Sequence, residues 1–331
     1  MDIREIDRSD EGQLRAFWQV GKDAEDAFRP YDFYVPWVTA RLAYVEGRPG
    51  FRNQMFGAFD GDLMVGRCYL NYPMLDNTHL CFGDVHVLPE HQRRGVGTAL
   101  VERASQEAKA FGRRTLVAEA YVPSGAGGPA LDFARALGFT EAIEEGIKIV
   151  DLPATEASWE MLAHEAGARS EGYRLVPWLD VVPQELLAGF CRLNEAFNEL
   201  APSGELELEA EVWDEARVRN GEALNAKVSR HVLAVAALDA DGEMVGLTEA
   251  IINDNAPQRG FQSGTLVLPA HRGHALGLAM KVANHQALRL AYPQCEIMMT
   301  GNAGVNAAMN AVNERLGYRE VERCVEVQKG I

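Results

Sequence analysis

The sequence predicts an α/β (α+β) protein that consists of two copies of one domain. Its 331 residues are enough for about two compact domains. Short motifs recur in the same order, and three pairs of them lie 180 residues apart: Val65-Gly66 and Val245-Gly246, Leu88-Pro89 and Leu268-Pro269, and Gly97 and Gly277. A period of this length indicates duplicated domains, because the repeats of solenoid proteins are only about 20–50 residues long.

Each copy is expected to begin with a strand and an amphipathic helix. In the first copy these cover 3–6 and 11–28, and in the second copy 173–176 and 183–197. Three strands should follow, because alternating or continuous apolar residues stand between turn residues. Their ranges are 55–59, 63–72 and 79–88 in the first copy, and 231–238, 243–252 and 261–268 in the second.

The second half of each copy predicts a strand–helix–strand crossover. The third strand leads into a glycine-containing turn and a helix whose apolar residues recur every three or four positions, from Val96 and from Leu276. A further strand (115–122; 296–300), a short helix and closing strands complete each copy. The short helices end at matching motifs 179 residues apart, Leu137-Gly138-Phe139 and Leu316-Gly317-Tyr318. This order predicts a mixed, mostly antiparallel central sheet flanked by helices.

The boundary between the copies is expected in a polar, alanine-rich segment that has no strand pattern. We therefore predict domains at 1–152 and 172–331, joined by a linker at 153–171. Large apolar side chains in the linker favour a docked helix over a loose tether; they are Trp159, Met161 and Leu162.

The charge composition limits the classes of partner. The chain has 32 Lys and Arg against 48 Asp and Glu, a formal net charge of −16. This charge disfavours nucleic acid, whose affinity depends on neutralised phosphates, and suits a cationic or amine-bearing ligand, although an acidic surface can also serve solubility alone. The glutamate-rich stretch 201–211 is expected to form an ordered loop over the second copy, where it could line an acceptor cleft.

The sequence predicts a cytoplasmic protein without a metal site. Its five cysteines form no CxxC pair and have no His spacing suited to zinc, so we expect buried, reduced thiols. His271 and His274 lie three residues apart, but no third ligand stands in a plausible frame. The N-terminus is charged from its second residue, and no apolar stretch approaches the length of a membrane span, which argues against a signal peptide and a transmembrane helix.

The turn after the third strand of the first copy predicts an anion-binding site. Gly95 and Gly97 open the following helix, where unpaired backbone N–H groups and the helix dipole favour a pyrophosphate. Arg93 and Arg94 add positive charge. A dinucleotide-binding fingerprint does not fit, because Leu100 occupies its third glycine position, and the GK[ST] sequence of a P-loop is missing.

The turn also resembles a known family. The segment Gln92-Arg93-Arg94-Gly95-Val96-Gly97 fits the Q/R-x-x-G-x-G/A signature of the GCN5-related N-acetyltransferases (GNAT), and the second copy resembles the family at 266–281 and 300–318. The resemblance covers nearly the whole chain as two tandem GNAT domains, a layout similar to that of mycothiol synthase and other tandem acetyltransferases. It implies acetyl-CoA as the cosubstrate and no metal.

The resemblance further implies which residues bind coenzyme A. The pyrophosphate would lie on 92–98 or 272–278, and a backbone N–H near Val87 or Val267 would meet the thioester oxygen. The implied binding residues are Val87, Leu88, Gln92, Arg93, Arg94, Gly95, Val96, Gly97 and Thr98 in the first copy, and Val267, Leu268, Arg272, Gly273, His274, Ala275, Leu276, Gly277, Asn302 and Asn306 in the second.

Each copy departs from the family pattern in a different part. In the second copy, Ala275 stands in place of the first signature glycine. In the short helix, the first copy has Gly127 and Ala134 where the second has Asn306 and Asn313. Neither copy keeps the tyrosine that in this family can protonate the departing CoA thiolate, so protonation by water is the expected alternative.

Transfer of an acyl group to an amine needs a group that removes the proton of the amine. In the first copy Asp84, His86 and Glu119 lie on strands that flank the expected cleft, although each can also be read as a solvated carboxylate or a packed surface histidine. In the second copy the polar candidates are Asn313, Thr265 and Glu249. These residues leave open which copy is catalytic.

The function expected from this resemblance is direct transfer of the acetyl group of acetyl-CoA to a primary amine of a small, cationic molecule. The expected acceptor is an amino sugar, an amino acid, or a secondary metabolite or antibiotic. Two alternatives remain: a protein or peptide N-acetyltransferase, and a CoA-binding module without chemistry. We expect neither nucleic acid nor a membrane as partner, and a monomer or a homodimer.

Overall fold

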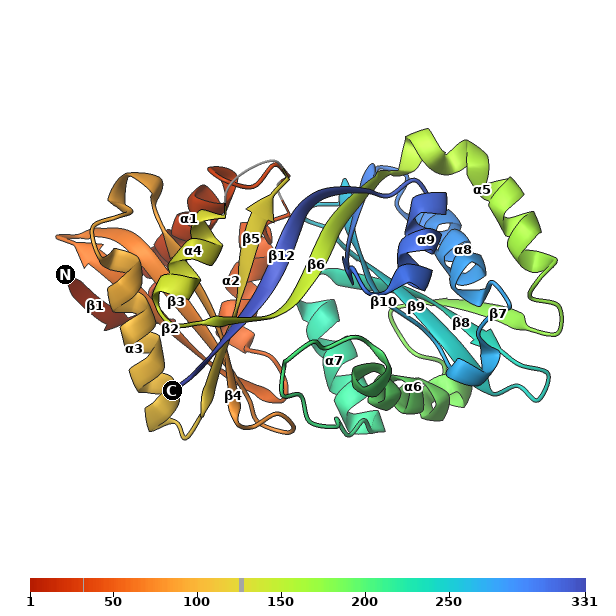
Figure 1. Ribbon diagram of the computed structural model, residues 1–331, viewed down its shortest axis with the longest axis horizontal. Helices are drawn as coiled ribbons and strands as arrows, with labels where there is room; N and C mark the ends of the chain where they lie inside the picture. Colours follow the sequence, from red (N-terminus) through yellow and green to blue (C-terminus); the bar gives the residue numbers. More distant parts are fainter. Residues whose placement is uncertain (32, 125–127) are drawn as a thin grey trace. The chain divides into compact units, whose positions relative to one another are not determined.

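The computed structural model describes residues 1–31, 33–124 and 128–331. The chain forms two compact units (Figure 1). The N-terminal unit comprises Met1–Glu144, Ser203–Glu209 and Glu322–Ile331, and the C-terminal unit comprises Glu145–Pro202 and Ala210–Val321. Each unit contains a mixed, mostly antiparallel sheet with helices on both faces, which confirms the fold class predicted from the sequence.

In the N-terminal unit the strands follow the order β1-β2-β3-β4-β5-β12. Neighbouring strands are antiparallel except β4 and β5, which are parallel because helix α3 connects them. The bounds are β1 Asp2–Glu5, β2 Phe51–Asp60, β3 Leu63–Pro73, β4 Leu80–Val87, β5 Thr115–Pro123 and β12 Arg319–Gly330.

Two pairs of helices cover this sheet. Helices α1 (Glu11–Asp26) and α2 (Trp37–Glu46) pack on one face, where Phe17 and Tyr44 meet edge to edge with ring centres 5.6 Å apart. Helices α3 (Val96–Ala110) and α4 (Pro129–Ala136) cover the other face with an apolar core around Leu100. Asp10 caps α1, since its side chain accepts from the backbone N–H of Gln13 at 3.1 Å. The sequence did not predict α2, which has no polar face.

The C-terminal unit repeats this arrangement with the strand order β6-β11-β10-β9-β8-β7. The parallel pair is here β10–β11, connected by helix α8, and the other pairs are antiparallel. The bounds are β6 Thr140–Asp151, β7 Arg174–Leu179, β8 Arg230–Leu238, β9 Met244–Asn253, β10 Arg259–Val267 and β11 Ile297–Ala303.

Helices also cover both faces of this second sheet. Helices α5 (Leu152–Gly167) and α8 (Leu276–Ala291) share a core with buried Trp159, while α6 (Leu187–Leu200) and α7 (Glu215–Lys227) pack on the other face. The short helix α9 (Ala307–Arg315) lies against α8. The segment expected to dock as a linker helix is thus α5, and it belongs to the C-terminal unit. No helix in the described ranges is long and apolar enough to cross a membrane.

The limits of the units differ from the domain limits expected from the sequence. The last strand, β12, pairs with β5 of the N-terminal unit, and β6, which follows α4 in the sequence, pairs with β11 of the C-terminal unit (Figure 1). Residues 203–209 also belong to the N-terminal unit, where the backbone N–H of Glu209 donates to Asn77 Oδ1 at 2.7 Å. The expectation that this acidic stretch covers the second copy is therefore wrong.

Candidate functional site

The site in the N-terminal unit begins where β4 and β5 separate. Their parallel pairing ends at Phe82 and Val117, although both strands continue. The backbone N–H of Leu88 donates to Val65 of β3 at 3.0 Å, so the N–H of the preceding Val87 points the other way, into the opening between β4 and β5. Unpaired strand N–H groups of this kind can donate to an oxygen atom in the opening.

A cavity of about 550 Å³ occupies this opening. Its volume is in the range of small-ligand sites. One side is apolar and comes from α3, α4 and the strand ends, and the other side carries ionisable groups. The apolar side includes Val101, Ala104, Ala120, Phe133, Ala134 and Phe139, and the polar side includes Glu25, Asp84, His86, Glu119 and Tyr121. The structure therefore brings the three candidate bases of the first copy, Asp84, His86 and Glu119, into one cavity.

The turn between β4 and α3 has the geometry of an anion site. Gly95, at the N-cap of α3, has a φ of 85°, and a Cβ at this position would meet no atom within 4 Å, so the space above the backbone is open. Arg93 and Arg94 are exposed beside it. Gln92 donates from Nε2 to the carbonyl of Val87 at 3.0 Å and fixes the turn to the strand end. The remaining expected residues of this turn, Leu88, Val96, Gly97 and Thr98, lie at the end of β4 and in the first turn of α3.

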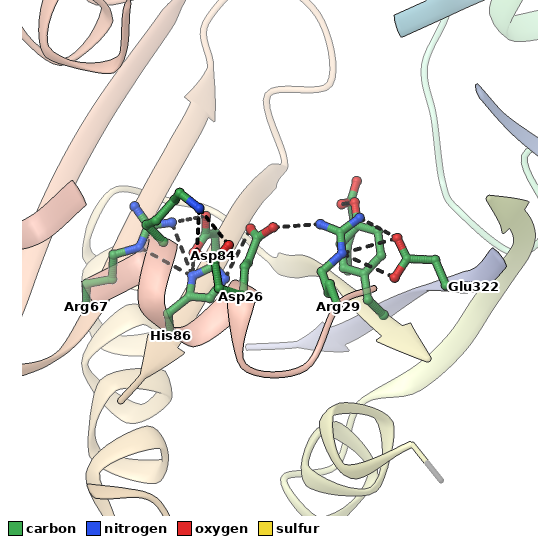
Figure 2. A network of polar contacts seen from close by, with 10 residues as sticks. Asp26, Arg29, Arg67, Asp84, His86 and Glu322 are labelled. Atoms are coloured by element: carbon green, nitrogen blue, oxygen red, sulfur yellow. Dashed lines mark hydrogen bonds and ion pairs between the residues drawn. The ribbon is translucent and has the colours of Figure 1, made fainter. Parts of the chain in front are cut away.

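A network of charged side chains forms the polar side of the cavity (Figure 2). Asp84 Oδ2 accepts from Arg67 Nη2 at 2.7 Å, and Asp84 Oδ1 lies 2.6 Å from His86 Nδ1. On its other side, His86 Nε2 lies 3.5 Å from Glu25 Oε1. Arg67 Nε also lies 3.3 Å from His86 Nδ1, so this nitrogen faces both a guanidinium and a carboxylate. We assign the ring proton to Nδ1, because its contact with Asp84 is the shorter of the two.

The charges of this network lower the pKa of Asp84 and raise the pKa of His86. Burial opposes the charged form of Asp84, but Arg67 and His86 outweigh it and hold the pKa of Asp84 well below its usual value. Burial would lower the pKa of His86, but Asp84 and the contact with Glu25 raise it above its ordinary value of about 6.5. A proton that arrives on Nε2 is thus stabilised by carboxylates on both sides of the ring.

The last strand supplies the outer part of the network. Arg29, near the C-terminal end of α1, donates to Glu25 at 2.7 Å and to Glu322 of β12 at 2.6 Å (Figure 2). The guanidinium of Arg29 also stacks on Tyr121, 3.6 Å from the ring centre. Tyr121 in turn donates its hydroxyl to Glu119 Oε2 at 2.5 Å. Burial and the adjacent Glu119 raise the pKa of Tyr121 well above its usual value, so the hydroxyl keeps its proton.

In the C-terminal unit the corresponding turn has the same backbone course. Arg272 donates to the carbonyl of Val267 at 3.1 Å, as Gln92 does to Val87 in the N-terminal unit. Ala275 at the N-cap of α8 has a left-handed φ of 55°, and Gly273 has a φ of 88°. Each turn thus has two residues with a positive φ, which are Arg93 and Gly95 in the first copy and Gly273 and Ala275 in the second. The glycine occupies the second of these positions in the first copy and the first of them in the second copy. The remaining expected residues, Leu268, His274, Leu276 and Gly277, lie in this turn and in the first turn of α8.

Other contacts occupy the two histidines beside this turn. Tyr173 OH lies 3.0 Å from His271 Nδ1, and its ring stacks on His274 with centres 5.2 Å apart. Among the described residues, no group of three or more His, Cys, Asp or Glu side chains could hold a metal ion. A second cavity, of about 280 Å³, lies beside His271 and Leu268, at a distance from the opening between β10 and β11.

The polar candidates of the C-terminal unit each contact different neighbours. Asn306 caps α9 by accepting from the N–H of Met309 at 3.3 Å, and Asn313 bonds to Asn302 within the unit. Thr265 lies 2.7 Å from the hydroxyl of Thr248. Burial raises the pKa of the half-buried Glu249 to about 7. Gly127, named above for the short helix of the first copy, lies outside the described residues.

Sequence reasoning missed several members of the N-terminal network: Glu25, Arg29, Arg67, Tyr121 and Glu322. Arg67 gave a usable signal, because an arginine inside the apolar run of β3 needs a buried acidic partner. The others gave none, since α1 carries many charges and Glu322 stands in a strand that the sequence assigns to the other copy.

Comparison with known proteins identifies the class of protein. Residues 18–139 match the acetyltransferase (GNAT) family. The match lies within the N-terminal unit and covers more than a third of the chain, so this part of the chain carries a GNAT acetyltransferase domain. Its fold is of the tandem-domain type, as the whole-chain similarity to solved structures shows. Among curated proteins, none matches this sequence.

Two solved structures illustrate the whole-chain similarity. A tandem GNAT protein from the clavulanic acid biosynthesis pathway has a TM-score of 0.80 at 24% identity, over 99% of this chain and 98% of that one. A GCN5-related N-acetyltransferase from Sphaerobacter thermophilus has a TM-score of 0.67 at 16% identity, over 99% and 95%. At such identities the similarity shows a common fold.

Proposed function

We propose that the N-terminal unit transfers the acetyl group of acetyl-CoA directly to a primary amine of a small, cationic molecule. The observation that carries this proposal is the cavity between β4 and β5, which contains a histidine held between two carboxylates. The open turn at Gly95 follows the end of β4. The five cysteines are thiols in the structure, and we expect the protein in the reducing cytoplasm. We further expect a monomer or a homodimer.

The donor would bind along the opening. The exposed turn at 92–98 offers backbone N–H groups, the helix dipole and the cations Arg93 and Arg94 to the pyrophosphate. The apolar side of the cavity suits the pantetheine arm. The N–H of Val87 points into the opening, where it would stabilise the negative charge that develops on the thioester oxygen.

His86 is the base that we propose. Its Nδ1 lies 2.6 Å from Asp84, and its Nε2, which faces Glu25, is the nitrogen that we propose accepts the proton of the attacking amine. The imidazolium formed in this step is stabilised by Asp84 and Glu25, and this stabilisation is the reason why the pKa of His86 is raised. The CoA thiolate leaves and takes a proton from water, since the short helix carries no tyrosine.

The charge of the cavity supports a cationic acceptor. The network contains four carboxylates, Glu25, Asp84, Glu119 and Glu322, against the two guanidinium groups of Arg29 and Arg67, so its net charge is negative. An ammonium group would be attracted to this side of the cavity and would release its first proton to water, and the neutral amine would attack the thioester while His86 takes up the second proton. Amino sugars, amino acids and basic secondary metabolites share this chemistry.

Thiol release from acetyl-CoA with a panel of small amines tests the proposal, with Gly95→Glu as the inactivating variant. The glutamate would fill and charge the turn, so we expect donor binding to be lost. Ala275→Glu is the matched control, because it places the same side chain at the corresponding N-cap of the other unit. Activity that survives Gly95→Glu would contradict the assignment to the N-terminal unit.

The same assay separates the alternatives. A CoA-binding module without chemistry would bind CoA in calorimetry and release no thiol with any amine. A protein or peptide N-acetyltransferase would release thiol only with peptides, and mass spectrometry would locate the added acetyl group on a lysine or an N-terminus. We expect acetylated small amines instead.

A further inference from the structure

The opening between β10 and β11 of the C-terminal unit contains a buried polar cluster, which we call the lysine cluster: Lys281, Asn302, Asn313 and Tyr318. Lys281 is 1% exposed, and its Nζ donates to Asn313 Oδ1 at 2.5 Å. Asn313 then donates to Asn302 Oδ1. The Lys281 Nζ also lies 4.9 Å from the ring centre of Tyr318. One connected set of side chains thus joins α8, β11, α9 and the start of β12.

Each member of the lysine cluster corresponds to a residue that lines the cavity of the N-terminal unit. Lys281 follows Val101 by 180 residues, the offset of the surrounding motifs. Asn313 and Tyr318 follow Ala134 and Phe139 by 179, the offset of the short helices. The helices match in space as well, because Leu100 lies over Gly66 and its counterpart Met280 lies over Gly246.

The strand register shows that Asn302 corresponds to Ala120, which is the fourth matching pair. The parallel pairing ends at Phe82 and Val117 in the N-terminal unit and at Phe261 and Met299 in the C-terminal unit. Three residues beyond Val117 and Met299 stand Ala120 and Asn302. The cavity-lining residues Val101, Ala120, Ala134 and Phe139 are therefore replaced, position by position, by Lys281, Asn302, Asn313 and Tyr318.

We propose that the lysine cluster closes the C-terminal unit to the pantetheine arm of acyl-CoA, so that the chain binds one acyl-CoA, in the N-terminal unit. Three of the replacements introduce larger side chains, and the hydrogen bonds hold them across the opening. Insertion of the arm would displace these side chains and break their hydrogen bonds, and the alkyl segments of the arm cannot replace those bonds. This inference rests on the donor site proposed above and assigns Asn302 and Asn313 to closure instead of to acyl binding.

The state of Lys281 agrees with a closed site. Within the described part of the chain, no carboxylate lies at ion-pair distance from its Nζ, and burial, together with the nearby Lys148, lowers the pKa of Lys281 to about 7. A lysine without an acidic partner in this place is costly for the fold, because the charged amine loses its hydration. Only the C-terminal unit is destabilised in this way, because the N-terminal unit has Val101 at the matching position.

Isothermal titration with CoA tests the proposal through the number of sites. The wild-type chain should bind one CoA, which Gly95→Glu abolishes and Ala275→Glu leaves intact. The triple variant Lys281→Val, Asn302→Ala, Asn313→Ala, which introduces the residues of the N-terminal unit, should bind two. Adding Ala275→Glu to the triple variant should return it to one.

Three results would overturn closure. The wild-type chain could bind two CoA molecules, or it could bind one that is lost in Ala275→Glu and kept in Gly95→Glu. The third result is a folded triple variant that still binds one CoA. Lys281→Met is the control, because it keeps the bulk and removes the charge, so it should remain at one site. If the triple variant does not fold, the wild-type site count with the two glutamate variants decides. A wild-type chain that binds no CoA would contradict the donor site, and a gain of one site in the triple variant would still support closure.

Discussion

The contact of Asp84 with His86 and Arg67 leads to a prediction for Asp84→Asn, which removes one negative charge at almost constant shape. The carboxylate lies 2.6 Å from His86 Nδ1 and accepts from Arg67 Nη2 at 2.7 Å. Because Asp84 raises the pKa of His86, the variant should lower that pKa towards its ordinary value. If His86 is the base, the rate of acetyl transfer should fall by about 10²- to 10⁴-fold.

The structure also bounds the effect of Asp84→Asn on stability. Breaking a fully buried ion pair costs about 3–5 kcal/mol, and an exposed pair is worth about 0–1 kcal/mol. The Arg67 side chain is 3% exposed and that of Asp84 is 42% exposed. We therefore expect an intermediate loss, about 2 kcal/mol in the free energy of unfolding at pH 7.

The pH dependence of this loss has a definite sign. The pKa of Asp84 is lowered in the folded state, so its contribution is complete above the unfolded-state pKa of about 3.9 and is lost as the pH falls through the lower folded-state pKa. Asp84 also raises the folded-state pKa of His86, which adds stability that is complete below the unfolded-state pKa of about 6.5 and is lost as the pH rises through the folded-state pKa. The difference between the wild-type chain and Asp84→Asn should therefore grow as the pH falls from about 8 to about 6 and shrink below about pH 4.

Two measurements check the prediction for Asp84. NMR titration of the His86 ring, assigned with His86→Gln, should give a pKa above about 6.5 in the wild-type chain and a lower one in Asp84→Asn. Urea unfolding at several pH values gives the stability difference. Glu141→Gln is the control, because Glu141 pairs with Arg135 on the surface of the same unit. An unchanged His86 pKa would refute the pairing, and an unchanged rate would refute His86 as the base.

Three further variants test separate parts of the structure. Ala275→Gly should raise the free energy of unfolding by about 1 kcal/mol in urea, because glycine adopts a positive φ without strain, and an unchanged stability would argue against a left-handed residue there. Gly97→Val should weaken CoA binding and cost about 1–3 kcal/mol, since a Cβ would approach Phe133 Cζ to 2.9 Å; native affinity in calorimetry would contradict this contact. Glu322→Gln should cost about 1–3 kcal/mol in thermal or urea unfolding, because Glu322 is buried while the half-buried Arg29 keeps Glu25 as a partner, and an unchanged stability would contradict the pairing.

The repeat and the local chemistry of the turns made much of the fold predictable. The 180-residue offset between motifs predicted two copies of one domain, and the alternation of apolar residues predicted the positions of most strands. The turn at 92–98 was found because glycines and arginines after a strand have a direct physical meaning. The helices α2 and α7 were missed, because their apolar residues do not form a clear stripe.

The partners of the last strand could not be predicted from the sequence. A closing strand such as β12 has the same alternating pattern whether it pairs within its own copy or with β5 of the other. For this reason Glu322 was not expected near Arg29. The candidate bases Asp84, His86 and Glu119 were predictable as polar residues on strands that flank an opening, whereas the contact of Lys281 with Asn313 joins elements far apart in the sequence.

The central claim is that the N-terminal unit holds acetyl-CoA between β4 and β5, with its acyl end at His86. A crystal structure of the chain with acetyl-CoA tests this most directly. We expect density for the pyrophosphate on the turn at 92–98, for the pantetheine arm along Val101 and Ala134, and for the thioester oxygen at the N–H of Val87. Density on the turn at 272–278 with an empty opening between β4 and β5 would contradict the claim.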